Sequence, residues 1–74
     1  MARNAALTTS YAQVWAGTYE AYAVCTAAWR LADKASPGAT EYALIPANVV
    51  VPLPMGKPSF VRSETGTPTL QIIE

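Results

Sequence analysis

The chain has 74 residues and a formal net charge of zero, and 51% of its residues are apolar while only 14% are charged. The five cations are scattered and form no basic stripe, which argues against a nucleic-acid partner, and no apolar run approaches the roughly 18–20 residues of a membrane-spanning helix. Because the chain has no His and a single Cys, it lacks an ordinary metal-ligand set, and we expect no cofactor.

Residues 11–34 allow two interpretations. Ser10 and Gln13 fit a capping box ahead of an Ala-rich stretch, which favours a helix over 11–34 and an α+β fold. Gly17 interrupts that helix, and the Thr and aromatic side chains favour strands instead. The second interpretation places short strands at 5–9, 13–16, 21–26 and 29–33. In the third of these, Tyr22, Val24 and Thr26 alternate with Ala21, Ala23 and Cys25, as in a half-buried strand.

The second half of the chain predicts further strands with clearer boundaries. They lie at 41–45, 49–51, 59–63 and 69–73, with turns rich in Pro and Gly between them. Pro52 and Pro54 indicate an edge strand or a bend, since Pro donates no hydrogen bond to a ladder. Gly66 is expected at positive φ in the last hairpin. The sequence therefore predicts an all-β fold, a small sandwich or barrel of about six to eight short antiparallel strands in one domain over residues 1–74.

The apolar residues divide into an expected core and an expected interface. We predict that the core contains Trp29, Leu31, Leu44, Val50, Phe60 and Leu70. A chain this short buries only about 60% of its unfolded surface, and small folds often gain stability from partner chains. Tyr11, Trp15 and Tyr19 are therefore expected to face a neighbouring chain. Glu20 is the single charge in residues 11–29, and interface cores are poor in charge and rich in aromatic rings.

Groups able to carry out catalysis are few in this sequence. Cys25 has no His to generate a thiolate, so it is predicted to be a small buried apolar residue. The carboxylates of Glu20, Asp33, Glu41, Glu64 and Glu74 are expected at the solvated surface, because so small a sheet offers little depth for a cleft. No Ser lies in a nucleophile elbow or a phosphate loop. We expect that the chain is not an enzyme.

Six segments, in their order along the chain, resemble one family. They are Leu7-Thr8-Thr9, Val14-Trp15-Ala16-Gly17, Trp29-Arg30-Leu31-Ala32-Asp33, Pro37-Gly38-Ala39-Thr40, Phe60-Val61-Arg62-Ser63, and Gly66-Thr67 with the strand that follows. This order resembles that of small all-β virion proteins of tailed bacteriophages, and the resemblance covers nearly the whole chain. It favours strands over the helix at 11–34 and implies a sandwich or barrel subunit on the capsid or tail.

The resemblance implies a structural role. The chain is expected to decorate or stabilise the capsid as a cement protein, or to anchor a spike or fibre. Its expected partners are copies of itself, with a trimer favoured, and the major capsid protein or other virion proteins. No apolar segment follows the Met-Ala-Arg-Asn start, so a secretory signal is not expected, and the chain would reach the virion from the host cytoplasm. The alternative function is a small β-sandwich module that binds glycan or peptide on exposed Trp15 and Tyr19.

Overall fold

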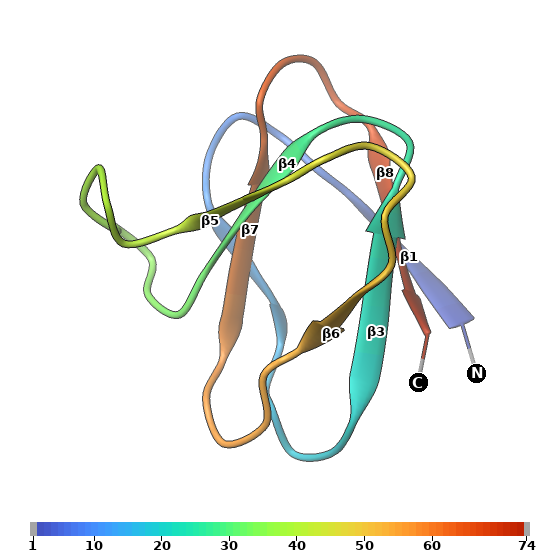
Figure 1. Cartoon of the computed structure of the whole chain (residues 1–74), viewed down its shortest axis with the longest axis vertical. Coiled ribbons are helices and arrows are strands. Elements are labelled where there is room, and N and C mark those ends of the chain that lie inside the picture. Colours follow the sequence, from blue (N-terminus) through green and yellow to red (C-terminus); the bar gives the residue numbers. More distant parts are fainter. Residues whose placement is uncertain (1, 74) are drawn as a thin grey trace.

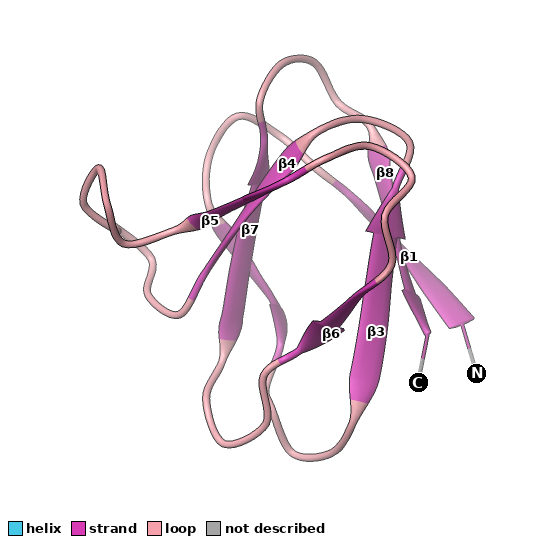
Figure 2. Ribbon diagram, viewed as in Figure 1, coloured by secondary structure: helices cyan, strands magenta, loops and turns pink. Residues whose placement is uncertain are grey.

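The computed structural model describes residues 2–73, and these residues form eight strands and no helix (Figures 1 and 2). The strands are β1 (Ala2–Ala6), β2 (Ala12–Trp15), β3 (Ala21–Cys25), β4 (Trp29–Ala32), β5 (Ala43–Ile45), β6 (Val51–Leu53), β7 (Ser59–Ser63) and β8 (Thr69–Ile73). The predicted all-β fold of short antiparallel strands is confirmed. The helix over 11–34 is wrong, because β2, β3 and β4 lie in that segment. Within residues 2–73, nothing forms a helix long and apolar enough to cross a membrane.

The strands form two four-stranded antiparallel sheets that face each other across the core (Figure 1). Sheet A has the order β1-β8-β3-β6, and sheet B has the order β2-β7-β4-β5. Most consecutive strands lie in different sheets, so the chain crosses the sandwich repeatedly. The last two strands occupy interior positions, β7 between β2 and β4, and β8 between β1 and β3. Each sheet is therefore complete only when both halves of the chain are present.

Strand alternation places one set of side chains between the sheets, and these form the core. The core cluster consists of Leu7, Trp15, Ala21, Ala23, Cys25, Trp29, Ile45, Leu53, Val61, Leu70 and Ile72. Burial of Trp29 and Leu70 confirms two of the predicted core residues, and burial of Cys25 confirms its prediction as a small apolar residue. Leu31 packs partly buried against this cluster. The prediction of Phe60 as a core residue is wrong, because Phe60 is half-buried beside Ala32 on the outer side of sheet B.

The predictions of Leu44 and Val50 as core residues are also wrong, since Leu44 is 59% exposed and Val50 is 58% exposed. Leu44 is the middle residue of β5 and pairs with Arg30, and its neighbour Ile45 points inward instead. Val50 precedes β6, whose register turns Val51 and Leu53 toward the core. Both errors come from the period of two in a strand, where a shift of one residue exchanges the buried and exposed faces.

Ser59 and Ser63 make a matched pair, because both are 0% exposed in β7. The Ser63 hydroxyl donates to the carbonyl of Gly66 at 2.8 Å, whereas the Ser59 hydroxyl has no hydrogen-bond partner among the described residues. We expect Ser63→Ala to lower the free energy of unfolding by about 1 kcal/mol, and Ser59→Ala to change it by less than about 0.5 kcal/mol or to raise it. Urea denaturation measures both values, and equal losses would contradict the prediction.

Candidate functional site

The outer face of sheet A carries no charged side chain among the described residues. Register and alternation place on it Asn4 and Ala6 of β1, Tyr22 and Val24 of β3, Pro52 of β6, and Thr69, Gln71 and Ile73 of β8. We call this set the uncharged face. Its apolar row runs across three strands, because Tyr22 is paired with Ile73 on one side and with Pro52 on the other. Tyr22 and Ile73 are each 39% exposed.

Glu20 lies at the border of the uncharged face and is held there by Tyr22. The Tyr22 hydroxyl donates a hydrogen bond to the Glu20 carboxylate. This bond, together with the nearby negative charge, raises the pKa of Tyr22 above its ordinary value. Tyr22 was not among the predicted interface residues. The alternation of residues 21–26 did predict the face on which it lies, opposite Ala21, Ala23 and Cys25.

The outer face of sheet B has the opposite character, since two arginines are paired across neighbouring strands. Arg30 of β4 is directly opposite Arg62 of β7, an arrangement in which like charges repel. Glu64 relieves this repulsion through an ion pair and hydrogen bonds with Arg30. The guanidinium of Arg30 also lies 4.5 Å from the centre of the Tyr42 ring, and that of Arg62 lies 5.9 Å from the centre of the Tyr11 ring. Tyr11 is therefore half-buried beneath a cation of its own chain.

The Arg30–Glu64 pair should make the fold sensitive to acid. Hydrogen bonding from Arg30 holds the pKa of Glu64 below its ordinary value, so the folded state binds fewer protons than the unfolded chain, in which Glu titrates at about 4.3. The stabilisation is complete above that ordinary pKa and is lost as the pH falls through the lower folded value. The effect should be modest, because the two side chains are 25% and 33% exposed.

We expect Glu64→Gln to flatten the acid limb of a plot of urea midpoint against pH from 7 to 2. In the background of Arg30→Gln, the same substitution should have a much smaller effect on that limb, since only the weaker attraction of Arg62 then lowers the pKa of Glu64. An unchanged acid limb in Glu64→Gln would show that the pair contributes nothing to the pH dependence.

A groove of about 510 Å³ lies where the edges of β1 and β2 approach each other, and it contains two of the predicted interface residues. Trp15 lies beneath it and is only 6% exposed. Its indole N–H donates to the carbonyl of Tyr19 at 3.2 Å, and the two rings meet edge to face with centres 5.1 Å apart. Arg3 reaches across from β1, donates to the carbonyl of Val14, and places its guanidinium 5.7 Å from the centre of the Trp15 ring.

The prediction that Trp15 faces a neighbouring chain, or forms an exposed binding platform, is therefore wrong. A register shift between Gln13 and Trp15 places Trp15 opposite Ser59, with its ring in the core of its own chain. Tyr19 is 54% exposed and accessible to a partner. Its interface role stays a prediction, as does that of Tyr11.

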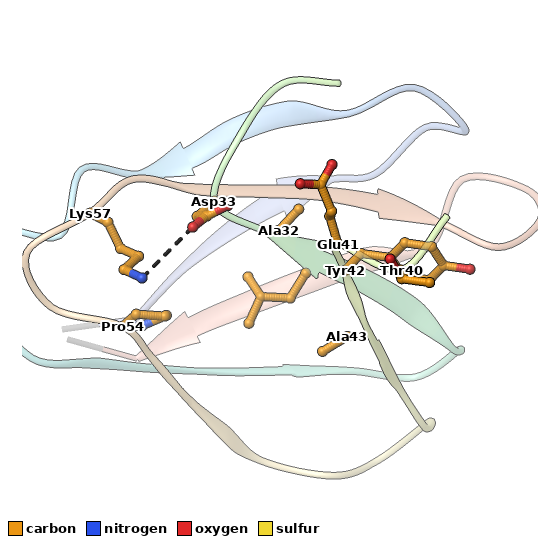
Figure 3. Close-up of a pocket in the computed structure, with 9 residues that line it drawn as sticks. Ala32, Asp33, Thr40, Glu41, Tyr42, Ala43, Pro54 and Lys57 are labelled. Carbon is orange, nitrogen blue, oxygen red and sulfur yellow. Dashed lines mark ion pairs between the residues drawn. The ribbon is translucent and has the colours of Figure 1, made fainter. Parts of the chain in front are cut away.

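A second depression, of about 360 Å³, opens beside β5 (Figure 3). It is lined by Leu31, Ala32, Asp33, Thr40, Glu41, Tyr42, Ala43, Pro54 and Lys57. Asp33 and Lys57 point toward each other at one end with their charged atoms 3.7 Å apart, and the Tyr42 ring lies at the other end. Asp33 thus forms an ion pair with Lys57, which lies just before β7.

The second acidic residue of this pocket, Glu41, also has its carboxylate bound by groups of the same chain. The Glu41 carboxylate accepts hydrogen bonds from Lys34 and from the backbone N–H of Gly38, each at 2.7 Å. These contacts lower the pKa of Glu41, with Lys34 the larger cause. Across residues 2–73, no three His, Cys, Asp or Glu side chains gather as a metal site would require. The pocket therefore presents the aromatic ring of Tyr42, an apolar wall and charged groups that are already paired.

These features define the chain as an eight-stranded antiparallel sandwich with one uncharged outer face, one arginine-bearing outer face and an open pocket at the β5 edge. No family model matches the chain, and no curated protein or solved structure matches it significantly.

Proposed function

We propose that the chain is a structural subunit of a tailed-bacteriophage virion that attaches to the capsid shell, or to another virion protein, through the uncharged face. The observation that carries this proposal is the unequal distribution of charge between the two outer sheet faces. The resemblance of the six segments to small all-β virion proteins supports it, and the sandwich is the architecture which that resemblance implies. The trimer expected from the sequence remains a prediction.

The chemistry of the uncharged face suits permanent contact with protein. The row formed by Ile73, Tyr22 and Pro52 is apolar and includes an aromatic ring, and Val24 lies half-buried beside it. Interface cores are depleted of charge and enriched in aromatic residues. A single face of so small a sheet offers limited area. Many copies attached to one shell compensate for a weak contact by each copy.

Co-sedimentation with particles tests this proposal. Virions released by the strain that encodes the chain are purified and examined for it by mass spectrometry, and its absence from them would refute the virion role. Tagged chain is then bound to particles from a strain with the gene deleted. We expect the double substitution Tyr22→Lys and Ile73→Lys to weaken binding by about 30-fold or more, as loss of a central apolar contact does.

Leu44→Lys is the matched control for that experiment. Leu44 is 59% exposed on the outer side of sheet B, so the substitution adds one lysine, against the two of the double variant, to an exposed apolar site on the other face. It should bind particles as the unchanged protein does. Equal weakening by both variants would indicate that charge alone reduces binding, and would remove the uncharged face from the proposal.

A second candidate function, binding of a glycan or peptide, is favoured by the pocket beside β5. Its volume lies within the range of small-ligand sites, and Tyr42 supplies an aromatic wall on which a sugar ring or apolar side chain can stack. The binding surface would be this pocket, since Trp15 is buried. A titration with short oligosaccharides, followed by NMR, should shift amides of residues 31–43 only if this function is correct. Tyr42→Phe should preserve stacking, and Tyr42→Ala should abolish it.

A further inference from the structure

Four strands form the edges of the sandwich, namely β1 and β6 in sheet A, and β2 and β5 in sheet B. An edge strand presents unpaired backbone N–H and C=O groups, to which another strand can be added. Native proteins usually protect such edges with Pro, bulges, charges or short length. The four edges of this chain are protected to very different extents.

Three of the edges are interrupted. In β6, Leu53 and Val51 are paired with Ala21 and Ala23 of β3, and alternation turns the backbone of Pro52 toward the free edge, where Pro has no N–H to donate. The strand β2 contains a register shift between Gln13 and Trp15. The strand β5 has only three residues and is followed by Pro46.

The edge of β1 has none of these interruptions. It has five residues, with no Pro and no shift in its register with β8. The N–H of Leu7 donates to the carbonyl of Pro68 at 2.9 Å, so the backbone of Leu7 faces β8. By alternation, Arg3 and Ala5 also face β8, while Ala2, Asn4 and Ala6 direct their N–H and C=O groups away from the sheet.

The charged side chain in β1 does not protect this edge either. Arg3 is directed back into its own sandwich, where it donates to the carbonyl of Val14 and lies over the ring of Trp15. The side chains of Asn4 and Ala6 are small and exposed, so they leave room for an approaching backbone. The edge is therefore open to a second backbone at Asn4 and Ala6.

We infer that β1 pairs with β1 of a second copy of this chain in antiparallel orientation about a two-fold axis through Asn4. That register places Asn4 opposite its equivalent, and Ala2 opposite Ala6. All the outward-directed backbone groups of both strands then meet in hydrogen-bonded pairs, and sheet A becomes continuous across the two copies. The inference rests on the geometry of this edge and holds whether or not the chain is a virion subunit.

A two-fold contact fits this chain better than a three-fold ring. Pairing of an edge with itself is isologous and closes at two copies, whereas a ring requires two different edges that fit each other. The other edges are those interrupted by Pro52, by the shift in β2 and by the short length of β5. Backbone hydrogen bonds add little net free energy in water, so the pair is best detected by covalent trapping.

Disulfide trapping with Asn4→Cys tests the inference. In the proposed register the two Cα atoms at position 4 lie about 5.5 Å apart, within the range of roughly 4.4–6.8 Å that a disulfide spans. Gln71→Cys is the matched control, because Gln71 is paired with Asn4, is exposed on the same face and lies one strand inward. Its two copies would be about 14 Å apart, three strand spacings, and could not be linked within the pair. Both variants keep the buried Cys25.

In a glutathione redox buffer we expect Asn4→Cys to form the linked dimer at least about ten-fold faster than Gln71→Cys, since only the first satisfies disulfide geometry. Equal rates in the two variants would overturn the inference, because they would reflect random collision. Attachment to particles does not enter this experiment, so a negative result leaves the virion proposal intact, and loss of particle binding leaves this pairing intact.

Asn4→Pro provides a second test without added thiols. The N–H of Asn4 faces the free edge, so Pro removes a donor of the proposed pair without removing a bond to β8. Sedimentation equilibrium at millimolar concentration should show dimers of the unchanged protein and their loss in Asn4→Pro, with circular dichroism verifying the fold. A monomeric or trimeric unchanged protein, or full dimerisation of a folded Asn4→Pro, would refute the two-fold pair. If Asn4→Pro fails to fold, the disulfide rates decide.

Discussion

Gly17→Ala is expected to lower the free energy of unfolding by about 3–5 kcal/mol, because it combines backbone strain with overlap of atoms. Gly17 is buried at φ +82° in the connection between β2 and β3. A Cβ at this position would lie 2.3 Å from the carbonyl oxygen of Lys57 and 2.9 Å from its nitrogen. The carbonyl of Gly17 also accepts a hydrogen bond from the N–H of Gly56 at 3.0 Å. Two turns thus pack backbone against backbone, and neither can withdraw alone.

The matched control is Gly56→Ala in the opposing turn. Gly56 has φ +85°, yet nothing lies within 4 Å of a Cβ built there. Its substitution incurs backbone strain alone, about 1–2 kcal/mol. A domain of this size has a total stability of roughly 4–11 kcal/mol, so Gly17→Ala should be close to unfolding while Gly56→Ala stays folded. Urea midpoints measure the difference. Equal losses of stability in the two variants would mean that the two turns can move apart at little cost in free energy.

Trp29→Ala should cost about 3–5 kcal/mol, as truncation of a fully buried aromatic side chain does. Trp29 is 0% exposed and lies in the interior strand β4, with Ile45 on one side and Ser63 on the other. Removing the ring leaves a cavity that two sheets fixed by their ladders cannot close. Chemical denaturation at 25 °C provides the measurement. If no folded protein is obtained, Trp29→Leu should give a smaller, measurable loss.

Leu44→Ala serves as the control for Trp29→Ala. Leu44 belongs to the neighbouring strand β5 and is exposed, so its truncation should change the free energy of unfolding by less than about 0.5 kcal/mol. The pair of variants also tests the corrected core, since the sequence placed both residues inside. If Leu44→Ala lowered the free energy of unfolding as much as Trp29→Ala does, Leu44 would have to be a core residue.

The sequence predicts this fold best where side chains alternate cleanly and a turn residue is unambiguous. The strands at 59–63 and 69–73 are confirmed at both ends, and Gly66 between them has the expected positive φ of 69°. The first strand was predicted at 5–9 but spans Ala2–Ala6. Its small Ala and Asn side chains have no strand signature, and pairing with β8 determines where it lies.

The candidate sites were harder to predict, because they depend on contacts between distant residues. Trp15 has the composition of an interface residue, and only the register shift against β7 turns it inward. Arg30 contacts both Glu64 and Tyr42, and these residues lie far from it in the sequence. By contrast, the outward direction of Tyr22 follows from local alternation. The sequence alone could not show that Tyr22 lies in an apolar row that crosses three strands.

The interior position of β8 has a consequence for how this chain acquires its structure in the cell. Residues 69–73 are synthesised after the other seven strands, yet they lie between β1 and β3 and provide the strand with which β1 pairs. Until they emerge, β1 has no partner and sheet A is divided. Sheet A can therefore form only after residues 69–73 have been synthesised, and its non-local β pairing is of the kind that forms slowly. A stop codon before residue 69 would leave the product without a central strand and open to aggregation or proteolysis.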